Sequence, residues 1–145
     1  MREVEMRIGW MGFSAALAVL ILLPSLLAPP GSAAEQDPVA AAESAAQADA
    51  ETAEGKKFGE ALGQAFGREH GSTIQRCAKE AKRGDLSGFD LFVRVDGAGV
   101  VDQALVKPSN TLATCVRDAM PGWKVSVVPP HAGFWVEVSV NLKSE

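Results

Sequence analysis

The 145-residue chain has no tyrosine, only two cysteines and two histidines, and charged residues make up just 22% of it. A chain this short holds one small domain with accessory segments, which excludes a multi-domain enzyme. No two carboxylates are spaced for acid–base work, and Asp96, Asp102 and Asp118 are expected to be solvated or capping acids. The sequence therefore predicts a non-enzymatic protein with no catalytic residue, no cofactor and no metal site.

The first segment, residues 1–34, lacks any charge between residues 8 and 28. Arg2 and Arg7 precede this apolar stretch, and small residues at 32–34 follow it, which is typical of a secretory signal peptide cleaved after Ala34. The same stretch is long enough to cross a bilayer, so an uncleaved membrane anchor is the alternative. Cleavage predicts a periplasmic or secreted protein, and the membrane is a partner only if the segment is retained.

The second segment, residues 35–55, lacks basic residues and has no apolar side chain larger than Val39. Asp37 followed by Pro38 is typical of a helix start, and Gly55 is a plausible stop. Alanine favours a helix, but the segment offers no large apolar residue with which to dock. We expect a solvated, acidic, alanine-rich spacer that is helical only in part.

The remaining segment, residues 56–145, carries 12 basic and 10 acidic side chains and no basic stripe. This balance argues against nucleic acid as a partner, because phosphate binding needs clustered positive charge.

Helical periodicity in this domain gives way to strand periodicity at Phe89. Gly71 marks a break or a kink, Ser72–Gln75 is typical of a capping box that opens a second helical stretch, and Gly84 is a plausible cap at its end. The helical stretches carry Phe58, Leu62, Ala65 and Phe66, then Ile74, Cys77, Ala78 and Ala81, and later Leu112, Cys115, Val116 and Ala119. The expected strands cover 89–95, 100–106, 123–127 and 134–142. The turn at residues 96–99 is expected to join the first two strands as a β-hairpin, and residues 108–110, ending at Asn110, are expected to cap the next helix. The order α-β-β-α-β-β predicts a small α+β, two-layer domain whose antiparallel sheet is covered by two helices.

These spacings resemble the TonB C-terminal-domain superfamily, and in particular its two-cysteine branch of the gliding-motility type. The resembling residues span 74–142 and are Ile74, Cys77, Leu86-Ser87-Gly88, Gly99, Val101, Ala104, Ser109, Cys115-Val116 and Trp123. One departure is that the family usually has an aromatic residue and a proline just after the tryptophan, where this chain has Val125 and Ser126.

The resemblance implies a periplasmic binding module, since TonB-type domains add an extended partner segment to a sheet edge. The expected partner is another, unidentified envelope protein. An inner-membrane-anchored, energy-transducer-like protein is an alternative, but residues 8–28 hold none of the ionisable groups that would couple such a helix to a proton-driven motor. A homodimer formed by sheet-edge pairing is a further alternative.

Cys77 and Cys115 are expected on facing core helices, and in an exported domain this points to a disulfide. Two buried thiols, or metal ligation together with His70 and His131, are the alternatives. A secreted thiol-dependent enzyme that pairs one cysteine with His70 would need an exposed, reactive thiol.

Partner contact is expected at Trp135, which lies on the polar face of the last predicted strand beside Glu137. Phe92, on the polar face of the first strand, would extend this patch if the two strands are neighbours. The alternative is that the N-terminal helix or a second copy of the domain covers Trp135. Trp123 is expected to be a packing residue.

Overall fold

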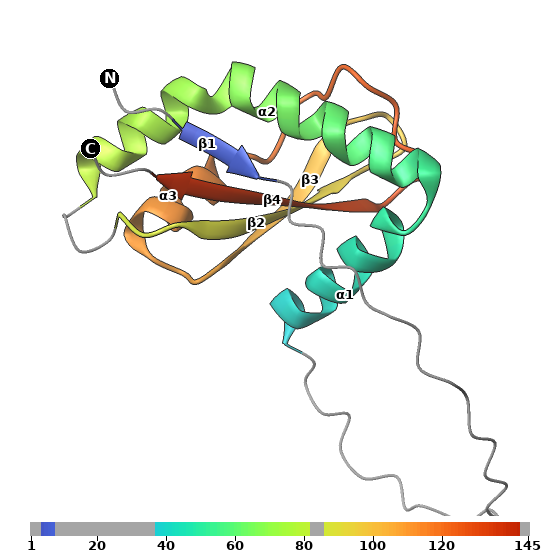
Figure 1. Cartoon of the computed structure of the whole chain (residues 1–145), viewed down its shortest axis with the longest axis horizontal. Helices are drawn as coiled ribbons and strands as arrows, with labels where there is room; N and C mark the ends of the chain where they lie inside the picture. Colours follow the sequence, from blue (N-terminus) through green and yellow to red (C-terminus); the bar gives the residue numbers. More distant parts are fainter. Residues whose placement is uncertain (1–3, 8–36, 82–85, 143–145) are drawn as a thin grey trace, which may run out of the picture.

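A computed structural model describes residues 4–7, 37–81 and 86–142 of the chain (Figure 1). The predicted cleavage site at Ala34, the apolar stretch 8–28 and the predicted helix cap at Gly84 lie outside the described residues. Within the described part, helices pack on an antiparallel sheet, which confirms the predicted small α+β fold.

The sheet is built around the predicted hairpin of β2 (Phe89–Val95) and β3 (Val101–Lys107). Asp96 organises the turn between them, because its Oδ1 accepts the N–H groups of Ala98 at 2.9 Å and Val100 at 2.8 Å. Gly99 completes the turn with a φ of +78°, a value that glycine adopts without the steric cost of a side chain. Asp96 is therefore a capping acid, as expected.

The last strand, β4 (Phe134–Leu142), pairs antiparallel with β2 along its length, and β1 (Val4–Arg7) pairs antiparallel with the end of β4, so the sheet order is β1-β4-β2-β3. The side chains of β4 alternate, with the valines and Phe134 buried and the residues between them half-buried or exposed. This alternation sends one set of side chains into the core and the other to the opposite, outer face of the sheet.

The core lies between the sheet and two helices, α2 (Ala53–Glu80) and α3 (Thr111–Asp118). Asn110 caps α3 as predicted, its Oδ1 accepting the N–H of Ala113 at 2.7 Å. The residues that α2 and α3 bury in this core are Phe58, Leu62, Phe66, Ile74, Cys77, Leu112, Ala113 and Val116. A disulfide between Cys77 and Cys115 joins the two helices, which confirms the predicted pairing.

Helix α2 runs through Gly71 without interruption, so the predicted second helix start at Ser72–Gln75 is wrong. Phe66 and Ile74, on either side of Gly71, are both buried in the same core. Packing on both sides holds the helix together across a residue that favours a break only weakly.

Residues 123–127 do not form the predicted strand. The stretch crosses the end of the hairpin, where Val101 donates to the Trp123 oxygen at 2.9 Å and Val125 donates to the Gly99 oxygen at 2.8 Å. Only an isolated bridge between Lys124 and Val100 results. The pairing is therefore limited to the residues around Val100, at the end of the hairpin.

The acidic segment forms helix α1 (Pro38–Ala50), capped by Asp37 as predicted, and it is not a solvated spacer. In Figure 1, α1 lies below the strands and α2 above them. Ala42 and Ala46 are 2% and 3% exposed and contact the outer face of the sheet. Small side chains thus bring α1 close enough to dock without any large apolar residue.

The turn between α1 and α2 requires a glycine at position 55. Gly55 was expected to end a helix, but it lies in the first turn of α2 and is buried. A Cβ at this position would overlap the Asp49 backbone oxygen. At Gly71, in the same helix, a Cβ would meet nothing within 4 Å.

We expect Gly55→Ala to lower the free energy of unfolding by about 1–3 kcal/mol through overpacking. The matched Gly71→Ala should raise it by up to about 1 kcal/mol, because alanine favours a helix over glycine. Urea unfolding of both variants measures the difference, and equal stability would show that α1 is not held at this turn.

The disulfide joins two residues that are 38 positions apart in the sequence. This link constrains the unfolded chain and thereby stabilises the fold by about 4 kcal/mol. Reduction should therefore shift the urea midpoint of the wild-type protein strongly downward. The Cys77→Ala, Cys115→Ala double variant serves as the control, since the reductant should leave its midpoint unchanged. An unshifted wild-type midpoint would contradict the stabilising role.

Candidate interaction site

The three residues expected to contact a partner lie together on the outer face of the sheet. The register between β2 and β4 places Phe92 opposite Glu137 and Arg94 opposite Trp135. β2 and β4 are neighbours, which is the condition for Phe92 to extend the patch around Trp135. Partner contact itself stays a prediction, whereas the position of each side chain is given by the structure.

This patch is covered by α1 and is not open as expected. Phe92 is only 1% exposed and packs against Ala42 and Ala46, with Trp135 partly buried at the same contact. A helix does cover Trp135, as in the alternative, but it is α1, from the segment that was expected to be a solvated spacer. The guanidinium of Arg94 lies 5.9 Å from the centre of the Trp135 ring, which leaves the indole between a cation and the helix.

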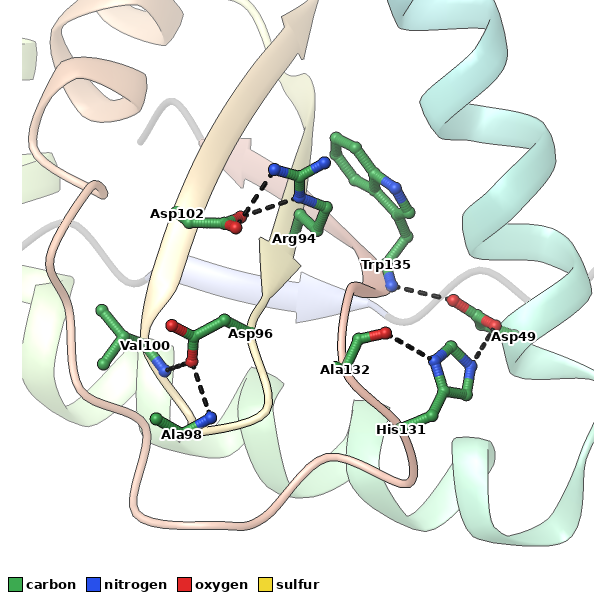
Figure 2. Close-up of polar contacts among 9 residues, drawn as sticks. All are labelled: Asp49, Arg94, Asp96, Ala98, Val100, Asp102, His131, Ala132 and Trp135. Atoms are coloured by element: carbon green, nitrogen blue, oxygen red, sulfur yellow. Dashed lines mark hydrogen bonds and ion pairs between the residues drawn. The ribbon is translucent and has the colours of Figure 1, made fainter.

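Asp49, near the end of α1, uses both carboxylate oxygens to bind the start of β4 and the loop before it (Figure 2). Its Oδ2 accepts the backbone N–H of Trp135 at 2.8 Å, and its Oδ1 lies 3.0 Å from Nε2 of His131. The Asp49 side chain is 17% exposed. Asp49 thus ties the helix to both the strand and the loop that precedes it.

A second ionic contact lies toward the other end of α1, where Nζ of Lys107 is 3.0 Å from Oε2 of Glu43. The carboxylate raises the pKa of Lys107. This pair is solvent-exposed, and exposed ion pairs contribute little to stability.

The Trp135 N–H points to the side of β4 that faces away from β2, so it takes no part in the hydrogen bonds between β2 and β4. In an antiparallel strand, alternate residues direct their N–H and C=O groups to the same neighbour, so Trp135 shares its direction with Ser139 and Asn141. Both of these lie in the stretch of β4, residues 139–142, that pairs with β1. Asp49 therefore occupies the same edge that β1 occupies further along β4.

Burial raises the pKa of Glu137, and the negative charges of Asp90 and Glu43 raise it further. Asp90 also accepts a hydrogen bond from the Ser139 hydroxyl at 2.7 Å. The outer face thus gathers carboxylates from α1, β2 and β4. Within the described residues, no group of His, Cys, Asp and Glu is arranged to hold a metal ion.

The two histidines lie in opposite environments. A hydrogen bond to the Ala132 carbonyl and a second one to Asp49 raise the pKa of His131. Burial lowers the pKa of His70, which packs against Phe66 and Trp123. Trp123 is a packing residue as expected, and its Nε1 donates to Glu69 at 2.7 Å.

Both cysteines are joined to each other, so neither is a thiol in this form of the protein. Asp102 and Asp118 are ion-paired and not merely solvated, with Asp102 bound by Arg94 and Asp118 by Arg117.

Asp49 and His131 are the site residues that sequence reasoning missed. The sequence places Asp49 in a segment expected to be a solvated spacer, and it offers His131 only as an alternative metal ligand. The one local signal is that Val39, Ala42, Ala46 and Asp49 recur at helical spacing. In a segment made largely of alanine, that stripe does not stand out.

Among the described residues, no helix combines the length and the apolar character needed to cross a membrane. Comparisons of the chain with protein-family models, with curated proteins and with solved structures found no match. The disulfide is compatible with a location outside the reducing cytosol.

His131 should titrate above the usual histidine pKa of 6.5 and His70 below it. Because folding raises the pKa of His131, its stabilising contribution is complete below the unfolded pKa and is lost as the pH rises through the folded pKa. NMR titration of the Asp49→Asn variant should show the His131 pKa part of the way back toward 6.5. His70 is the internal control and should not move, and an unchanged His131 would show that Asp49 does not contact it in solution.

Proposed function

We propose that the protein is an exported, periplasmic interaction module of the TonB C-terminal type, which binds an extended segment of another envelope protein by strand addition. The binding edge is the side of β4 that faces away from β2. Trp135 and Glu137 lie along this strand, and Phe92 lies beside them on β2.

One observation carries the proposal: this edge already takes up an added strand. Residues Val4–Arg7 pair antiparallel with residues 139–142 of β4, although they are distant in sequence. Strand addition uses the same main-chain hydrogen bonds, and a partner segment can form them as well as the chain's own N-terminus.

Export fits this arrangement. Cleavage after Ala34 would remove Val4–Arg7 together with the proposed signal segment, and it would leave the β4 edge to a partner. The disulfide between Cys77 and Cys115 supports a compartment where such bonds persist. The resemblance of residues 74–142 to two-cysteine TonB-type domains supports the same mode of binding.

A photo-crosslinking amino acid in place of Asn141, an exposed residue on this edge, tests the proposal in cells that make the protein. We expect an adduct with one envelope protein, formed through an extended segment. The control position is Gln103 on β3, the strand at the opposite edge of the sheet, where the adduct yield should be at least several-fold lower.

Equal yields at Asn141 and Gln103, or no adduct at Asn141, would count against strand addition at β4. An adduct between two copies of the chain would replace the partner with a homodimer.

A further inference from the structure

Helix α1 occupies the surface to which the partner segment is proposed to bind. Ala42 and Ala46 cover Phe92 on the outer face, and Asp49 accepts the Trp135 N–H at the β4 edge. An added strand that extended past residues 139–142 would offer a carbonyl oxygen to that same N–H. The carboxylate of Asp49 thus stands where a partner's backbone oxygen would bind.

The contact that holds α1 is small compared with the one that holds α2. Helix α1 contributes Ala42, Ala46 and the partly buried Val39, whereas α2 buries two phenylalanines, a leucine and an isoleucine. The cations in the ion pairs of α1 are exposed, with Lys107 59% and His131 56% exposed, whereas Asp49 is 17% exposed. Water and salt screen the Lys107–Glu43 pair, so it adds little to the docking.

The cap of helix α2 comes from Thr52, which lies outside α1, although its hydroxyl also donates to the Asp49 carbonyl at 3.3 Å. Thr52 caps α2 with its own hydroxyl, which accepts the N–H of Gly55 at 2.9 Å. Only Glu51 and Thr52 separate the two helices. Helix α1 can therefore leave the sheet by a change at these two residues, while α2 keeps its cap and its core contacts.

The start of the β4 edge suits a segment that carries an acidic residue. His131 lies there, and its Nε2 is 3.0 Å from the Asp49 carboxylate that also accepts the Trp135 N–H. Lys107 lies on β3, at the opposite edge of the sheet, and Asp90 and Glu137 add negative charge to the outer face, so the acidic residue is expected at His131 alone. Helix α1 supplies this carboxylate with Asp49. A partner that replaces α1 needs the same chemistry.

We propose that α1 is an internal cover of the partner site, which an acidic, extended partner segment displaces when it adds to the β4 edge. This regulation rests on the proposed function, because it concerns access to the same edge. In the covered state, Asp49 shields the Trp135 end of the edge and α1 shields Phe92.

The test uses two matched substitutions in the full chain, Ala46→Arg on the buried face of α1 and Ala48→Arg on its exposed face. Both add the same charge to the same helix, but only the first places it against Phe92. Hydrogen exchange of the Trp135 amide should become at least about tenfold faster in Ala46→Arg and stay unchanged in Ala48→Arg. The amides of β2 serve as the reference for an intact core.

The same two substitutions are then combined with the crosslinker at Asn141. We expect the adduct yield to rise several-fold with Ala46→Arg and to stay at the wild-type level with Ala48→Arg. Gly55→Ala, which displaces α1 from its turn without placing a charge on the sheet, should shift both readouts in the same direction as Ala46→Arg.

Faster exchange of the Trp135 amide with an unchanged adduct yield would overturn the proposal that α1 covers the partner site, while leaving the proposed function in place. A lower yield in both Ala46→Arg and Gly55→Ala would also overturn it, because α1 would then form part of the binding surface. No adduct in any variant, wild type included, would remove the proposed function and the cover with it.

Discussion

The alternation of β4 is the constraint on which the rest of the structure depends. Its buried residues, Phe134, Val136, Val138 and Val140, commit one face of the sheet to α2 and α3. The residues between them must then face outward, and they include Trp135 and Glu137 beside the apolar Phe92 of β2. A tryptophan and a phenylalanine side by side on an outer face form an apolar patch, which proteins cover or use for binding. Helix α1 covers it.

The sequence was sufficient to predict the elements that depend only on neighbouring residues. The period-two pattern of residues 134–142, the Asp96 turn and the Asn110 cap each depend on residues within a few positions, and each is present as predicted. The errors lie where distant packing decides. Helix α2 continues through Gly71 because both of its halves contact one core, and residues 123–127 pair only with the end of the hairpin around Val100.

The candidate site was half predictable for the same reason. Trp135, Glu137 and Phe92 follow from strand periodicity and are brought together by pairing between β2 and β4. Asp49 could not be placed, because it contacts Trp135 across 86 positions of sequence. An alanine-rich helix shows no apolar stripe of large residues, so its docking depends on how closely its backbone approaches the sheet.

The outer edge of β4 is protected at two points by two different means. Residues Val4–Arg7 pair with one end of the strand, and the Asp49 carboxylate binds the N–H of Trp135 toward the other end. Unpaired edges invite unwanted strand pairing, so an edge meant for a partner needs protection until that partner arrives. If residues 1–34 are removed during export as we propose, the first protection is lost and Asp49 remains. The Asp49 carboxylate, on a helix that docks through small side chains, then blocks short segments from pairing with the edge. A partner that supplies a full strand can still displace it.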